Sequence, residues 1–161
     1  MSMNKETIVC GFCLNTEEIV QYLEVTPPFL MIDYVENIIP GKSSRGIKKL
    51  SRDDWFFSCH LQQQQAMPGS LQIEAMLQTL VLTIYTIDGQ KGKISYVTEI
   101  KTKLFSKVTP DCELIIDASL LSYKRGLGKG VTVGKVNGVV VCQGEFTLIS
   151  PHEIPHPRIR R

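Results

Sequence analysis

The segment that most constrains the fold of this chain runs over residues 70–87. Pro68-Gly69-Ser70 precedes it and Asp88-Gly89 follows it, and these are the start and stop signals of a helix. Its apolar residues cover nearly the whole circumference of the predicted helix: Leu71, Ile73, Ala75, Met76, Leu77, Leu80, Val81, Leu82, Ile84 and Tyr85. A helix that is apolar on all sides is buried rather than laid on a surface. We therefore expect the rest of the chain to fold around it.

The chain after this helix is predicted to consist of strands. Four segments are rich in β-branched residues: 94–108, 112–123, 131–136 and 139–149. Asn137-Gly138 lies between the last two, and this dipeptide is favoured in two-residue hairpin turns. Consecutive strands joined in this way predict an antiparallel sheet.

The chain before the helix is predicted to contribute a short helix and two strands. Asn15 and Glu18 have the spacing of a capping box, which starts a helix over residues 16–23. The two strands are expected at residues 29–39 and 44–50. The sequence thus predicts an α+β fold, in which one antiparallel sheet of about six strands wraps around one long buried helix.

The chain is expected to form a single domain over residues 1–161. Residues 1–14 are expected to be an N-terminal extension, residues 53–60 to be irregular, and residues 151–161 to be a basic, proline-broken tail. A content of 43% hydrophobic and 21% charged residues is typical of a globular protein and argues against a disordered chain.

Charge and hydropathy restrict the partners and the compartment. The net charge of +2 is too small to indicate nucleic acid as a partner, and no apolar run has the length of a membrane helix. Five cysteines form no disulfide framework, which favours reduced thiols and a cytoplasmic location.

Two titratable residues lie where acid–base chemistry is possible. Glu74 falls one turn inside the apolar helix, where loss of solvation favours the protonated form of a carboxylate and makes it a candidate general acid. Taken alone, it can equally be a solvated glutamate stabilised by the helix dipole. His60 lies in the segment before the helix and is a candidate base, although a histidine in such a place is more often structural.

The start of the helix supplies a third element. Free N–H groups there can stabilise a developing oxyanion, and Gly69 allows a ligand to approach the backbone closely. A base, an acid and an oxyanion site together suit the removal of a proton next to a carbonyl, followed by loss of a β-leaving group.

Other motifs give weaker signals. Cys10 and Cys13 have a C-x-x-C spacing without a second pair, so we expect no metal, and no organic cofactor is expected either. Cys59 stands next to His60 and is a weak candidate for a thiol nucleophile. The glycine-rich residues 126–130 lack the context of a phosphate loop, so we expect a β-turn there.

With these residues the chain resembles the 3-hydroxyacyl-(acyl carrier protein) dehydratases of fatty-acid synthesis over roughly residues 18–150. The resemblance rests on His60, on Met67-Pro68-Gly69 and on Glu74-Ala75-Met76 with Gln78, and it is supported by the segments at 28–33 and 54–57. It implies the hotdog fold of that family, a sheet wrapped around a long helix.

The resemblance also implies a mechanism and an assembly. His60 would take the proton α to the thioester carbonyl, Glu74 would act on the β-hydroxyl, and the Gly69 amide would polarise the carbonyl. Met67, Pro68 and Gln78 would contact the substrate. In the family each site takes its His and its Glu from different subunits, so a homodimer or higher homo-oligomer is implied.

The chain departs from the family pattern around His60. It has Cys59-His60-Leu61-Gln62 where the family has Gly-His-Phe-Pro, and glutamines occupy the loop that follows. We therefore expect a divergent member, in fatty-acid or a related acyl or polyketide pathway. A non-catalytic hotdog protein that binds acyl thioesters, and a hotdog thioesterase that uses Glu74 to activate water, are the alternatives.

An acyl carrier protein is the expected substrate-bearing partner. It is acidic, so basic side chains are candidates for docking it. The candidates are Lys101, Lys103, Lys124, Arg125 and Lys129.

Overall fold

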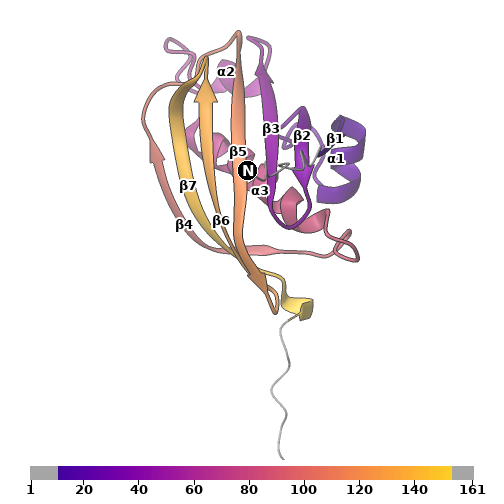
Figure 1. Cartoon of the computed structure of the whole chain (residues 1–161). Coiled ribbons are helices and arrows are strands. Elements are labelled where there is room, and N and C mark those ends of the chain that lie inside the picture. The colour runs from indigo at the N-terminus through magenta and orange to yellow at the C-terminus, as the bar shows by residue number, and fades with distance from the viewer. Residues whose placement is uncertain (1–10, 154–161) are drawn as a thin grey trace, which may run out of the picture.

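Seven strands form one antiparallel sheet with the order β1-β2-β3-β5-β6-β7-β4, and a long helix lies behind it (Figure 1). The structure, a computed structural model, describes residues 11–153. The strands are β1 (Phe12–Leu14), β2 (Tyr34–Ile39), β3 (Ser43–Leu50), β4 (Tyr96–Leu104), β5 (Cys112–Lys124), β6 (Leu127–Val136) and β7 (Val139–Ile149). The helices are α1 (Thr16–Leu23), α2 (Trp55–Cys59), α3 (Gly69–Tyr85) and a 3-10 turn at Pro151–Glu153.

Helix α3 is the centre of the core, as the apolar pattern predicts. Its residues Ala75, Met76, Leu80, Leu82 and Ile84 have no exposed surface. It contacts β2, β3, β5, β6 and β7 on one side and α1 on the other. The predicted sheet around one buried helix is confirmed, with seven strands rather than about six.

Glycines on the inner face of the sheet allow α3 to come close. A methyl group added at Gly46 would collide with Thr79 of α3, and one added at Gly130 would collide with Leu80. The Ser44 hydroxyl also donates a hydrogen bond of 2.8 Å to the Thr79 carbonyl. Side chains of α3 therefore pack directly against the backbone of β3 and β6, and these contacts fix the distance between the helix and the sheet.

The short helix α1 and the last hairpin form as predicted. The Asn15 side chain accepts from the Glu18 N–H at 3.0 Å, and the Asn15 N–H donates to the Glu18 carboxylate at 2.8 Å. Asn137 and Gly138 both have positive φ, 49° and 78°, which is the geometry of the primed hairpin turn. Local sequence signals thus determined both elements.

Three segments differ from the sequence predictions. Residues 29–33 are not strand, because the chain turns at Thr26, whose carbonyl accepts from the N–H groups of Phe29 and Leu30. Residues 53–60 contain α2 and are therefore not wholly irregular. Residues 12–14, expected in the N-terminal extension, pair with β2 as strand β1.

The strand β4 forms one free edge of the sheet, and every residue in it except Thr102 is exposed. Ile100 and Leu104 pair with the inward-facing Phe146 and Cys142 of β7, so their side chains lie on the inner face. They remain 46% exposed because no element among residues 11–153 covers them. An apolar strand with an unpaired edge is a surface suited to pairing with another strand.

No helix among residues 11–153 is long and apolar enough to cross a membrane.

The close contact between Gly130 and Leu80 gives a testable prediction. We expect Gly130→Ala to lower the free energy of unfolding by about 1–3 kcal/mol, because the added methyl group overpacks the helix–sheet contact. In a Leu80→Ala background the same change should cost less, because truncation of Leu80 opens the space that the methyl group needs. Urea denaturation of the four variants measures this, and equal costs in both backgrounds would contradict the packing argument.

Candidate active site

His60 lies at the C-terminal end of α2 and is half-buried. Its backbone N–H donates to the Phe56 carbonyl at 2.9 Å, which fixes the residue to the last turn of the helix. Its ring Nδ1 lies 3.2 Å from the Ala66 carbonyl oxygen. A carbonyl oxygen can only accept, so Nδ1 carries the proton in this contact and Nε2 keeps its lone pair. The nitrogen that can take a proton from a substrate is therefore Nε2.

The glutamine loop after His60 folds back to bring Ala66 to the imidazole. The Leu61 carbonyl accepts from the N–H groups of Gln64, at 2.7 Å, and of Gln65, at 3.1 Å. Leu61 and Gln65 adopt positive φ values of 43° and 44°. The loop thus orients His60 through its backbone.

The Met67-Pro68-Gly69 turn is held on both sides. The Met67 N–H donates to the Val108 carbonyl at 2.8 Å, and the Met67 carbonyl accepts from the Gln72 amide at 3.2 Å. Helix α3 begins at Gly69, and the first N–H groups of a helix have no acceptor within it. A methyl group at Gly69 would collide with Leu104 of β4, so the turn lies against the edge strand.

Glu74 is half-buried, and Gln78, one turn further along α3, orients its carboxylate. The Gln78 amide nitrogen donates to Glu74 Oε1 at 2.9 Å and to the Phe29 carbonyl at 3.0 Å. Its amide oxygen accepts from the Met31 N–H at 2.8 Å. These three hydrogen bonds involve both the nitrogen and the oxygen of the Gln78 amide. Gln78 therefore connects the Glu74 carboxylate to the backbone of Phe29 and Met31.

Glu74 lines a cavity of about 230 Å³. Leu77, Val81 and Tyr85 continue its wall along one face of α3, and residues of α1 and of the start of β4 close it. The lining is mainly apolar, which suits an acyl chain. His60 is not part of this wall, so this cavity contains only one of the two candidate catalytic residues.

The sequence analysis missed several residues that hold the site. Gln72 is buried and binds the Met67 carbonyl, and its own Oε1 has no partner among residues 11–153. Lys48 is buried between Asp33 and Asp54. Residues 43–50 show no alternation of apolar and polar residues, so nothing in the sequence marked Lys48 as an inward position.

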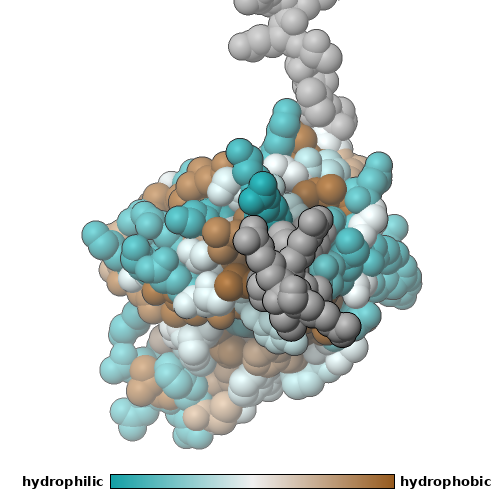
Figure 2. All heavy atoms as spheres, turned by 90° about the horizontal axis from the view of Figure 1, so that it is seen from below, coloured by the Kyte–Doolittle hydropathy of each residue, from teal (hydrophilic) through white to brown (hydrophobic). Residues whose placement is uncertain are grey.

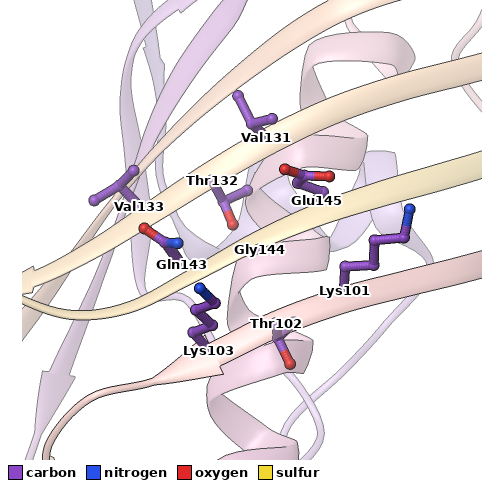
Figure 3. A pocket seen from close by; sticks show the side chains of 9 residues that line it. All are labelled: Lys101, Thr102, Lys103, Val131, Thr132, Val133, Gln143, Gly144 and Glu145. Carbon is purple, nitrogen blue, oxygen red and sulfur yellow. The ribbon is translucent and has the colours of Figure 1, made fainter.

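The candidate docking residues fall into two groups. Lys101 and Lys103 line a hollow of about 380 Å³ on the outer face of the sheet, beside Gln143 and Glu145 (Figure 3). Lys129 lines a second hollow, together with Lys101. Lys101 also lies 3.3 Å from Glu99, and its hydrogen bond and charge lower the pKa of that carboxyl.

Lys124 and Arg125 form the second group of candidate docking residues, at the turn between β5 and β6. This turn is at the lower end of the molecule in Figure 1, opposite the end that carries α2. Seen from that end, hydrophilic and hydrophobic residues are interspersed on the surface (Figure 2).

The weaker motifs acquire no chemistry in the structure. The Cys59 thiol faces the carbonyls of Trp55 and Phe56 in its own helix, at 3.5 and 3.8 Å. Cys13 is exposed, Cys10 lies outside the described residues, and within residues 11–153 no three His, Cys, Asp or Glu side chains cluster as metal ligands. The β-turn expected over the glycine-rich residues 126–130 is shorter than predicted: the turn takes Arg125 and Gly126, and residues 127–130 are already part of β6.

Comparison with known proteins connects this geometry to a family. Residues 24–145 match the model of the FabA-like domain. The chain is 36% identical over 134 residues to the 3-hydroxyacyl-(acyl carrier protein) dehydratase FabZ of Syntrophomonas wolfei, covering 83% of this chain and 93% of that protein. It is 34% identical to the FabZ of Caldicellulosiruptor bescii, over 82% of this chain and 95% of that protein.

Solved structures show the same architecture. The dehydratase heterocomplex ApeI:P of Xenorhabdus doucetiae matches with a TM-score of 0.69 at 19% identity, over 83% of this chain and 90% of that one. A sigma28-regulated virulence protein of Campylobacter jejuni matches with a TM-score of 0.66 at 13% identity, over 86% of this chain and 98% of that one. These likenesses confirm the hotdog fold. With the family model and the sequence relatives, they lead to one conclusion: the chain belongs to the FabA-like family of 3-hydroxyacyl-(acyl carrier protein) dehydratases.

Proposed function

We propose that this protein removes water from 3-hydroxyacyl thioesters carried on an acyl carrier protein and yields trans-2-enoyl thioesters, with His60 as base and Glu74 as acid. The observation that carries the assignment is the contact between His60 Nδ1 and the Ala66 carbonyl, which leaves Nε2 free to accept a proton. Elimination of water changes no oxidation state, so the reaction requires no redox cofactor.

The reaction divides among three groups of the chain. His60 Nε2 takes the proton from the α-carbon, and the electron pair of that bond moves toward the thioester carbonyl. The Gly69 N–H at the start of α3 stabilises the resulting negative charge on oxygen. Glu74 then gives a proton to the β-hydroxyl, the C–O bond breaks, and water leaves as the double bond forms. Return of the proton from His60 to Glu74 through solvent completes the cycle.

The site is proposed to form between two copies of the chain. Glu74 opens into a cavity whose wall excludes His60, and both groups must reach one substrate. The exposed edge strand β4 is the surface proposed for the contact between copies. Antiparallel pairing of two β4 strands about Ile100 would place Glu99 opposite Lys101 of the second copy and cover Ile100 with its own counterpart.

The carrier protein and the compartment belong to the same proposal. The outer-face lysines Lys101, Lys103 and Lys129 are proposed to attract the acidic carrier, and Lys124 with Arg125 offers a second basic group. The cytoplasm is the proposed location, because the four cysteines among the described residues, Cys13, Cys59, Cys112 and Cys142, are free thiols.

Removal of the base or the acid tests the assignment of His60 and Glu74. We expect His60→Ala and Glu74→Gln each to lower kcat for hydration of crotonyl thioester by about 10²–10⁴-fold, the usual contribution of a positioned acid or base. The ultraviolet absorbance of the conjugated thioester reports the reaction in the reverse direction. Gln63→Ala, an exposed change in the same loop, is the control and should retain full activity.

Two outcomes would contradict this assignment. Normal turnover in both variants would exclude His60 and Glu74 from the chemistry. Release of free thiol by the wild-type protein, detected with a thiol-reactive dye, would instead identify a thioesterase.

The β4 interface predicts a specific effect on assembly. We expect the wild-type protein to be a dimer or a multiple of a dimer in light scattering, and Ile100→Arg to be monomeric and inactive, because it places two like charges at the centre of the contact. Leu121→Arg changes an exposed apolar residue of β5, away from the β4 edge, and should leave the assembly intact. A dimeric Ile100→Arg variant would place the interface elsewhere.

The two basic groups make separable predictions for carrier docking. We expect Lys101→Ala with Lys103→Ala to raise KM several-fold for the carrier-bound substrate, because charge pairs at a contact mainly set the rate of encounter. KM for a small thioester analogue should stay unchanged. The pair Lys124→Ala and Arg125→Ala is measured in parallel, and an effect confined to that pair would move the docking site to the β5–β6 turn.

A further inference from the structure

Lys48 is a buried cation on the inner face of β3. Ser44 and Gly46 on the same face contact α3, so strand alternation places Lys48 among core positions. Its side chain is only 9% exposed, and its Nζ lies 3.4 Å from Asp33 Oδ1 and 3.4 Å from Asp54 Oδ1. A buried charge is costly unless it is paired, so these two carboxylates explain how the core accommodates it.

Asp54 connects Lys48 to the segment that carries His60. It immediately precedes α2, whose five residues end at Cys59, and His60 follows directly as the C-cap. The second oxygen of Asp54 accepts from the Ser51 N–H at 2.9 Å, and its carbonyl accepts from the Phe57 N–H at 3.0 Å. The short helix is thereby anchored at its beginning, one helix length from His60.

Asp33 connects Lys48 to the segment that supports Glu74. Its second oxygen accepts from the Lys49 N–H at 2.5 Å, and its own N–H donates to the Ile47 carbonyl at 2.8 Å. Asp33 ends the segment 28–33, whose Phe29 carbonyl and Met31 N–H hold the amide of Gln78. Gln78 in turn binds the Glu74 carboxylate.

The two segments share the hydrophobic core through Met31, Ile32 and Phe56, and a hollow separates them near Lys48. A cavity of about 310 Å³ lies between them and is lined by Lys48, Asp33, Asp54 and neighbouring residues. Across it, the indole N–H of Trp55 donates to the Pro28 carbonyl at 3.1 Å. The ion pairs of Lys48 and this hydrogen bond are the polar contacts that join the segments around the hollow.

We propose that Lys48 is a positioning residue for the dehydration, which ties the support of His60 to the support of Glu74 through Asp54 and Asp33. The inference rests on the proposed function. It assigns Lys48 no contact with substrate, because the lysine acts only through the two segments that it joins.

Arg45 provides a matched control on the same strand. It pairs with Asp117 at 2.7 Å, but its side chain is 41% exposed and lies on the opposite face of β3 from Lys48. Its ion pair connects β3 to β5 and touches neither α2 nor residues 28–33. Loss of this more exposed pair removes an ion pair from the same strand without disturbing the supports of His60 and Glu74.

The test measures kcat and KM for Lys48→Met, Lys48→Arg and Arg45→Met with crotonyl thioester. We expect Lys48→Met to lower kcat by about 10–100-fold with KM nearly unchanged, because misplaced catalytic groups slow the chemistry more than they weaken binding. Lys48→Arg keeps the charge and should recover most of kcat, and Arg45→Met should remain close to wild type.

Trp55 gives a second readout that needs no turnover. It is the single tryptophan of the chain and lies in the first turn of α2. We expect Lys48→Met to shift its emission and its quenching by acrylamide, and Arg45→Met to leave both unchanged. If Lys48→Met does not fold, Asp54→Asn replaces it, because the amide oxygen can still accept from Ser51 while the charge is lost.

Each outcome decides the proposal. The proposal is overturned if Lys48→Met keeps the wild-type kcat. It is also overturned if Lys48→Met and Arg45→Met both lose kcat in proportion to the fraction of each protein that is unfolded. Failure of the proposed function looks different: the wild-type protein then shows no turnover, and the Trp55 signal alone decides whether Lys48 positions α2.

Discussion

The burial of α3 against the inner face of the sheet is the constraint on which the rest of the structure depends. The helix has apolar side chains on every side, so it is stable only when strands cover one flank and α1 covers another. Glycines at 46 and 130 let Thr79 and Leu80 approach β3 and β6 closely. The depth and the rotation of α3 are therefore determined by side-chain contacts along most of its length.

The same contacts determine the position of the candidate catalytic groups. Gly69 is the first residue of α3 and Glu74 lies little more than one turn further, so a helix fixed in the core fixes both. The groups that orient the site are largely backbone atoms, namely the Ala66, Phe29 and Met67 carbonyls and the Met31 N–H. Backbone atoms are available whatever the side chain, which explains how the loop after His60 can carry glutamines and still hold the imidazole.

The elements with strong local signals could be predicted from the sequence, and those that depend on tertiary contacts could not. The capping box at Asn15 and the turn at Asn137 act within a few residues, so the sequence contains their whole cause. Helix α2 has five residues and no side-chain cap, so periodicity has too little length to reveal it. At the site, His60, Gly69 and Glu74 could be found by residue type and spacing, whereas the partners of Gln78 lie 47 and 49 residues away and required the fold.

Lys48 illustrates how a residue that conflicts with its surroundings can reveal a function. A lysine at an inward position of a strand opposes the burial pattern around it, and such conflicts are expected where a site imposes its own requirements. Under the proposed dimer, His60 and Glu74 of one chain belong to different active sites. Lys48 then joins, within a single chain, the support of the base of one site to the support of the acid of the other.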